Sequence, residues 1–167
     1  GIAYDQPAPA AKSIDPRVLI TSGMSKVYGL PGIRLGWISA PRQVIEACAV
    51  IRDYTSICPS CLSERLSSVV LARREVFLER SNALARTNIE IVDEWMMKNS
   101  DILSWSRQRG GVVCFPEYRA RVGSIDLCTL LAEKMGVLLI PGACFEMENR
   151  FRLGFGYDTR RLRVGLS

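Results

Sequence analysis

The stretch that decides the fold of this 167-residue chain is Gly23-Met24-Ser25-Lys26-Val27-Tyr28-Gly29-Leu30-Pro31-Gly32-Ile33-Arg34-Leu35-Gly36. It holds one lysine, an arginine eight residues later, and glycine at four positions. An apolar, β-branched run over Val18–Thr21 precedes the loop Ser22–Gly32, and the alternating run Arg34–Ser39 follows it. Because such runs bounded by glycine are typical of strands, we expect a strand, a glycine-rich loop and a second strand.

The side chains of this loop suit a phosphorylated aldehyde as ligand. A lysine amine that loses its proton readily can form an imine with an aldehyde carbon. An arginine guanidinium can hold a phosphate through two N–H donors, and glycines let a ligand approach the backbone closely. The sequence is not a P-loop, because it contains no G-x-x-x-x-G-K-[ST]. The alternative is a surface lysine in a flexible loop between two strands.

The same fourteen residues resemble the pyridoxal 5′-phosphate (PLP) attachment site of class I and II aminotransferases, with a permitted residue at every fixed position. The resemblance implies that Lys26 is the Schiff-base lysine, which forms the internal aldimine, and that Arg34 holds the cofactor phosphate. Family members often have serine three residues before the lysine, where this chain has Gly23. We therefore expect Ser22 or Ser25 to supply the hydroxyl that supports the cofactor.

A second stretch resembles the end of the family's small domain: Pro141-Gly142, then Phe145, then Arg152-Leu153-Gly154-Phe155. In that pattern the arginine of the strand binds the α-carboxylate of the substrate, and Arg152 is the residue that matches. An arginine suits this role because its planar guanidinium pairs with both carboxylate oxygens.

Two features near this stretch leave alternatives open. Arg150 would share the strand face of Arg152 if the strand began early, and we expect it to be solvated or structural, with the carboxylate anchor as its alternative role. Gly110-Gly111 fits either a family segment that closes near the substrate or a simple turn before a strand.

The remaining periodicity predicts alternating helices and strands, which together indicate a small α/β lobe after the linking helix. The expected helices are one from Pro41 to Tyr54, a long one over Leu62–Lys98 with a break near Arg73, one over Asp126–Met135 ended by Gly136, and a last one capped by Asp158. The expected strands are Ile102–Trp105, Val112–Phe115, Val137–Ile140 and Phe151–Phe155.

The resemblance implies an α/β fold: the C-terminal part of a fold type I PLP enzyme, with the end of the large domain, a linking long helix and a small α/β domain. Residues 1–73 are then a remnant of the large PLP-binding domain, and residues 74–167 are the small domain. The residues that contact the cofactor ring would precede this chain. Tyr4 is a possible ligand of the cofactor, but no motif surrounds it. We expect an isolated chain of this kind to bind the cofactor poorly.

Composition narrows the remaining classes of function. The net charge is +5, but basic residues are scattered, apart from Arg160, Arg161 and Arg163, so nucleic-acid binding is not expected. The absence of histidine excludes histidine-based triads and imidazole zinc sites, and we expect no metal. No apolar run is long enough to cross a bilayer, and residues 1–11 lack a signal-peptide pattern, so we expect a cytoplasmic location.

The six cysteines do not indicate a disulfide scaffold. Cys58-Pro59-Ser60-Cys61 could be a redox pair or half of a metal site, but we favour a turn leading into a helix with two packed thiols. The other four are expected to be small buried hydrophobic residues: Cys48, Cys114, Cys128 and Cys144.

The function that the resemblance implies is a PLP-dependent aminotransferase, a homodimer acting on an amino acid and a keto acid. The stretches Ile51–Tyr54 and Gly111–Pro116 look closest to a capreomycidine-synthase-like offshoot, whose members cyclise arginine-derived substrates. The alternatives are therefore a PLP-dependent cyclase, lyase or oxidase of a basic amino acid, or a non-catalytic fragment of such an enzyme.

Overall fold

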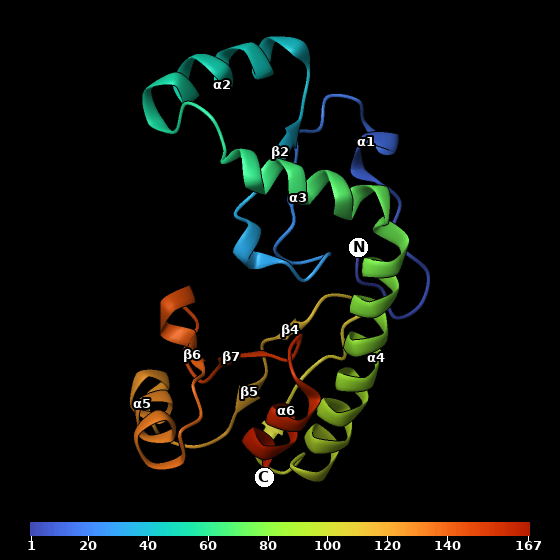
Figure 1. Ribbon diagram of the computed structural model, residues 1–167. Helices are drawn as coiled ribbons and strands as arrows, with labels where there is room; N and C mark the ends of the chain where they lie inside the picture. The colour runs from blue at the N-terminus through green and yellow to red at the C-terminus, as the bar shows by residue number, and fades with distance from the viewer. The chain divides into compact units, whose positions relative to one another are not determined.

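A computed structural model describes all 167 residues of the chain, which divide into two compact units (Figure 1). The first unit contains Gly1 and residues 6–81, and the second contains residues 2–5 and 82–167. Both units mix helices with short strands, as the predicted α/β class requires. No helix is both long enough and apolar enough to cross a membrane. The proposed domain boundary after residue 73 stays a prediction.

The first unit is built around an antiparallel hairpin of β1 (Ile20–Gly23) and β2 (Gly36–Ser39), in which Gly23 pairs with Gly36. This confirms the predicted order of strand, loop and strand, but the first strand lies two residues later than the expected Val18–Thr21 and includes Ser22 and Gly23. The second strand begins two residues later than predicted, because Arg34 has φ 55° and ψ 37°, a left-handed conformation that a strand cannot contain. The other elements of this unit are α1 (Ala11–Ile14), η1 (Pro31–Ile33), α2 (Arg42–Thr55), α3 (Cys61–Ala72) and the start of α4 (Arg74–Lys98).

The long helical stretch is broken once, as the sequence predicts. Arg73 ends α3, with its backbone N–H donating to the carbonyl of Val70 at 3.1 Å, and α4 begins at the next residue. Pro41 stands directly before α2, where its missing N–H costs no hydrogen bond.

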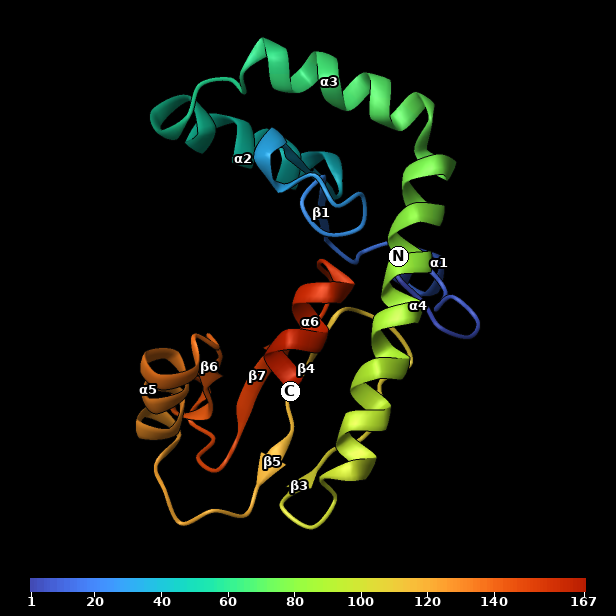
Figure 2. The same ribbon diagram turned by 60° about the horizontal axis from the view of Figure 1, so that its bottom comes forward.

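The second unit has β7 (Phe151–Gly154) at the centre of an antiparallel sheet, between β4 (Val113–Cys114) and β6 (Ile140–Pro141). A separate pair joins β3 (Leu103–Ser104) to β5 (Glu117–Tyr118). The helices are α5 (Ser124–Met135), α6 (Thr159–Leu166), the short η2 (Gly142–Phe145) and most of α4. Helix α6 lies beside α4 in both views (Figures 1 and 2), and a hydrogen bond joins Thr159 to Asn88.

The alternation along β7 places Arg152 on the open face of the sheet. Phe151, Leu153 and Phe155 are buried, whereas Arg152 and Gly154 are exposed. The buried side packs against the apolar face of α4, in a core that includes Ile89, Val92 and Met96. Burial of alternate residues therefore fixes the direction of the Arg152 side chain.

One predicted strand is largely wrong. Strand structure was expected over Val137–Ile140, but only Ile140 of that range lies in β6. Gly136 ends α5 in a left-handed conformation, with φ 66°, and the N–H of Val137 donates to Leu131 O at 3.1 Å. Val137, which completes the helix end, therefore cannot also pair in a sheet, and Leu138 and Leu139 form no regular structure. The strand β5 and the short helix α1 were not predicted.

The cysteines are only partly as predicted. Cys114 and Cys128 are buried, but Cys48 is half-buried and Cys144 is exposed in η2, so the prediction is wrong for Cys144. Cys61 is the first residue of α3, as expected of a turn leading into a helix, yet both thiols of the C-x-x-C are free and exposed rather than packed.

Candidate active site

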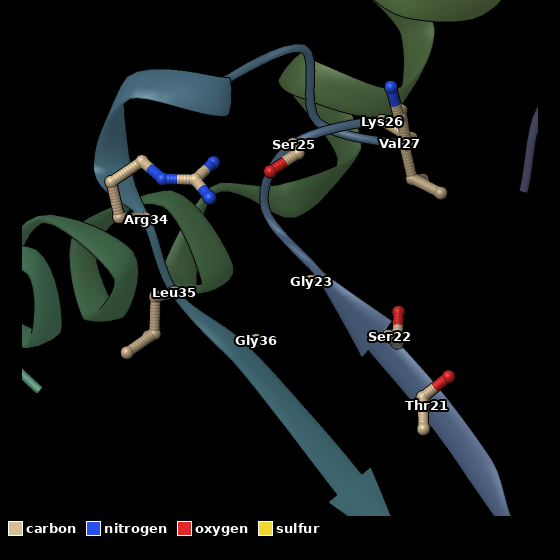
Figure 3. Close-up of a pocket in the computed structure, with 9 residues that line it drawn as sticks. All are labelled: Thr21, Ser22, Gly23, Ser25, Lys26, Val27, Arg34, Leu35 and Gly36. Atoms are coloured by element: carbon tan, nitrogen blue, oxygen red, sulfur yellow. The ribbon is translucent and has the colours of Figure 1, made fainter. Parts of the chain in front are cut away.

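The lysine loop and the hairpin that carries it form a pocket of about 500 Å³ (Figure 3). Its lining residues are Thr21, Ser22, Gly23, Ser25, Lys26, Val27, Arg34, Leu35 and Gly36. The four residues that the sequence assigns to the cofactor are all among them. Figure 3 shows the Arg34 guanidinium and the Ser25 hydroxyl turned toward each other, while the Lys26 amine extends out of the loop.

Met24 anchors the loop on which Lys26 stands. Its side chain is fully buried, its N–H donates to Leu35 O at 3.0 Å, and its carbonyl accepts from the N–H of Leu30 at 3.0 Å. Lys26 follows in a tight turn, in which its carbonyl accepts from the N–H of Gly29 at 3.2 Å. Gly29 has φ 66°, a conformation that glycine adopts without steric cost. The apolar anchor therefore holds the backbone of the loop while the lysine side chain remains exposed.

Arg34 directly follows η1, and only part of its guanidinium is hydrogen-bonded within the protein. Nη1 donates to the carbonyl of Pro31 at 3.1 Å, and neither Nε nor Nη2 has a protein partner. The left-handed backbone of Arg34 sets the direction in which this side chain leaves the hairpin. The guanidinium can thus offer its remaining N–H groups to an anion in the pocket.

The absence of serine at position 23 has a physical reason in this hairpin. A Cβ atom at Gly23 would lie 2.9 Å from the carbonyl oxygen of Leu35, and one at Gly36 would lie 2.8 Å from that of Ser22. Any side chain at position 23 would force the two strands apart. The hydroxyls that line the pocket come instead from the neighbours Ser22 and Ser25, and also from Thr21, which the sequence analysis did not assign. The only feature of the sequence that could have indicated Thr21 as a pocket residue is its position next to Ser22.

Arg152 belongs to the second unit, where it has no acidic partner. Its side chain is exposed, and its Cζ lies 5.9 Å from the centre of the Phe145 ring. Arg150 differs: its Nη2 bonds Glu117 Oε2 at 2.6 Å and its Nη1 donates to the carbonyl of Phe115 at 3.3 Å. The structure therefore supports the structural role for Arg150 and leaves Arg152 as the guanidinium available to a ligand.

Gly110 and Gly111 lie just before β4, and Gly110 forms an isolated antiparallel bridge with Ala3 rather than a simple turn. The N–H of Gly111, which has φ 85°, donates to Ile2 O at 3.1 Å, and a Cβ at Gly110 would lie 2.5 Å from the same oxygen. The hydroxyl of Tyr4 donates to the carbonyl of Gly111, and burial raises the pKa of Tyr4 to about 12. A second role for these glycines near a substrate stays a prediction.

Comparison with known proteins identifies the family. The sequence model of the family "Aminotransferase class I and II" matches residues 2–167, and the chain belongs to that family. Capreomycidine synthase of Streptomyces vinaceus is 35% identical over 167 residues, an alignment that covers 99% of this chain and 43% of that protein. The chain thus spans less than half the length of this relative.

Two solved structures show the same fold. A PLP-dependent aminotransferase of Streptococcus suis is 30% identical, with a TM-score of 0.92 over 98% of this chain and 44% of its own. The PLP-dependent cyclase OrfR is 31% identical, with a TM-score of 0.83 over 89% of this chain and 41% of its own. The predicted fold, part of a fold type I PLP enzyme, is therefore confirmed.

Proposed function

We propose that the complete protein is a PLP-dependent aminotransferase that acts on an amino acid. The observation that carries the proposal is the pocket that Lys26, Arg34, Ser22 and Ser25 line, in a chain of the class I and II aminotransferase family. Its volume of about 500 Å³ lies within the range usual for small-ligand sites.

The residues of the pocket fit PLP in their chemistry. The phosphate would be held by the unpaired N–H groups of Arg34, with the hydroxyls of Ser25 and Ser22 as additional donors. Lys26 would supply the amine that bonds the cofactor's aldehyde carbon. The lysine is exposed on a turn whose backbone is fixed, so its amine can reach a ligand without a change in the loop.

Lys26 then has a second task in proton transfer. When bound, PLP withdraws electrons from the bond that breaks at the substrate α-carbon. In its free amine form, Nζ of Lys26 would take the proton from the substrate α-carbon as a general base and would later donate a proton as a general acid. The chain contains no histidine, so this lysine is its most direct candidate for such work near neutral pH.

Arg152 is the proposed anchor of the substrate α-carboxylate. The exposed guanidinium has all five N–H donors available, whereas Arg150 is neutralised by Glu117. A carboxylate bound through two parallel hydrogen bonds is also oriented by them, which fixes the α-carbon relative to the anchor.

A second candidate function is cyclisation of a basic amino acid, with elimination and oxidation as related outcomes. It is favoured by the similarity to capreomycidine synthase and to the cyclase OrfR, whose sequence identity to this chain is at least that of the S. suis aminotransferase. Product analysis separates the two: transamination gives a keto acid and an aminated acceptor, and cyclisation gives neither. A non-catalytic protein would give no product and bind no cofactor.

The first experiment is an absorption spectrum of the complete protein with PLP, followed by borohydride reduction and peptide mapping. We expect a visible band and a reduced adduct on Lys26. The matched control is Lys12→Ala, which removes an exposed lysine of the same unit that bonds Ser39 Oγ outside the pocket. Lys26→Ala should abolish the adduct and Lys12→Ala should leave it unchanged. An adduct on another lysine would refute the assignment of Lys26.

We also propose, from family membership alone, that the complete protein forms a homodimer and works in the cytoplasm with amino-acid and keto-acid substrates. Size-exclusion chromatography with light scattering tests the first part, and a monomer in the PLP-loaded protein would contradict it.

A further inference from the structure

One phenylalanine ring, that of Phe145, lies against the guanidinium of Arg152, and a second ring, that of Phe115, packs against the first. Its Cζ is 5.9 Å from the centre of the Phe145 ring, and Phe145 meets Phe115 edge to face, with ring centres 5.4 Å apart and planes at 79°. This is the arrangement that aromatic pairs prefer, because the positive edge of one ring meets the negative face of the other. We call Phe145 and Phe115 the aromatic support.

The far side of the aromatic support is fixed by an ion pair. The Cζ of Arg150 lies 6.0 Å from the centre of the Phe115 ring, and the same guanidinium bonds Glu117 Oε2 at 2.6 Å. Its Nη1 also donates to the carbonyl of Phe115 at 3.3 Å. Arg150 thus contacts both the ring and the backbone of Phe115, and these contacts favour one position of the ring.

The backbone also fixes the near side, because η2 is tied to β7 and α5. The N–H of Gly142 donates to Arg150 O at 2.8 Å, and a Cβ there would lie 2.0 Å from Met147 O, so only glycine allows this approach. At the next residue, the N–H of Ala143 donates to the hydroxyl of the buried Ser124 at 3.0 Å. Phe145, the last residue of η2, is therefore placed before any ligand arrives.

We propose that Phe145 is a positioning residue that orients Arg152 for a carboxylate ligand; the inference rests on the proposed role of Arg152. An exposed arginine samples many rotamers, and binding must fix one of them. Attraction between the guanidinium and the face of the Phe145 ring narrows that choice beforehand. The ring contact uses no N–H donor, so all five remain for the carboxylate.

The effect belongs to binding and leaves proton transfer by Lys26 unchanged. Removing a contact of this type from an exposed arginine is expected to weaken carboxylate binding roughly two- to fivefold. A ligand whose carboxylate is replaced by a neutral amide of the same shape has no need of an oriented guanidinium. Its affinity should hardly change.

The test uses the complete, PLP-loaded protein with 2-aminoisobutyrate and its primary amide as probes, because neither has an α-proton to lose. Titration calorimetry gives the dissociation constant of each probe for the wild type and for Phe145→Leu. We expect the variant to lose affinity for the acid about two- to fivefold and to keep its affinity for the amide. With a turned-over amino acid, KM should rise while kcat changes little.

Three variants complete the design. Phe145→Tyr keeps a ring and should restore the affinity for the acid. Tyr157→Leu removes a comparable ring contact elsewhere in the unit, since Arg161 Cζ lies 5.9 Å from the Tyr157 ring centre, and should change neither affinity. Arg152→Gln should abolish the preference for the acid over the amide.

Each result bears on a different statement. Equal weakening of both probes by Phe145→Leu would mean a merely structural role and would overturn the inference, as would no change in either. If Arg152→Gln kept the preference for the acid, the proposed carboxylate anchor would fail and the inference with it. If Phe145→Leu is unfolded at the temperature of the assay, Phe145→Met is measured in its place, with the same expected results.

Discussion

Replacement of Asn88 by leucine tests how β7, which carries Arg152, is tied to α4. Asn88 is fully buried in α4 and its amide makes three hydrogen bonds. Nδ2 donates to Phe155 O at 2.7 Å and to Tyr157 O at 2.8 Å, and Oδ1 accepts from the hydroxyl of Thr159 at 2.7 Å. One side chain therefore holds the turn between β7 and α6.

The expected loss in free energy of unfolding follows from the hydrogen bonds that leucine cannot make. The carbonyl of Phe155 would lose its amide donor in a buried site, at about 1–3 kcal/mol. The carbonyl of Tyr157 and the hydroxyl of Thr159 are closer to solvent and can bond water instead. The loss of each of these two hydrogen bonds should cost about 1 kcal/mol. These losses sum to about 3–5 kcal/mol, and the bulkier leucine side chain leaves no cavity and can only add to the cost in this fully buried site.

Amide hydrogen exchange measures this cost locally, over peptides that cover β7 and α6 in the complete protein. A loss of 3 kcal/mol corresponds to exchange faster by over a hundredfold. Thr87→Ala, an exposed change one residue away on the same helix, should stay within about 0.5 kcal/mol of the wild type. Exchange within tenfold of the wild type for Asn88→Leu would refute the reasoning.

Two further predictions concern titrating groups of the second unit. The hydrogen bond from the N–H of Arg161 lowers the pKa of Asp158 below its usual 3.8. This cap should therefore stabilise α6 above about pH 4, and the stabilisation should be lost as pH falls through the lowered pKa. Asp158→Asn still accepts the hydrogen bond, so amide exchange in α6, compared at matched pH, should lose this pH dependence. Burial raises the pKa of Cys114 to about 12, so iodoacetamide at pH 8 should label the exposed Cys144 and spare Cys114. Equal labelling of the two cysteines in the peptide map would contradict the burial of Cys114.

The helix boundaries could be predicted because local chemistry sets them. Gly136 ends α5 through its left-handed conformation, and the Asp158 carboxylate accepts from the N–H of Arg161 at the start of α6. Strand β5 could not be predicted, because its two residues gain their structure only by pairing with β3. Pairing of this kind depends on distant parts of the chain and leaves no period in a two-residue segment.

The residues proposed to bind the cofactor could be grouped from the sequence for a related reason: they are close in sequence. Lys26 and Arg34 belong to one loop, and the hairpin brings both ends of that loop to one pocket. The contact between Phe145 and Phe115 joins residues thirty positions apart, and no spacing rule connects them. Tertiary packing alone creates it, so the aromatic support could be found only in the structure.

Arg150, just before β7, and Arg152, within it, show how the structure distinguishes two arginines that are close in sequence. The sequence presents both as guanidiniums two positions apart, each able to hold a carboxylate. The difference lies on the neighbouring segment, where Glu117 pairs with Arg150 and no acid lies opposite Arg152. Because Glu117 neutralises the charge of Arg150, we assign Arg150 a structural role and propose Arg152 as the arginine that binds a ligand. The proposal of Arg152 as the anchor therefore rests on the absence of an acidic partner beside it as much as on the arginine itself.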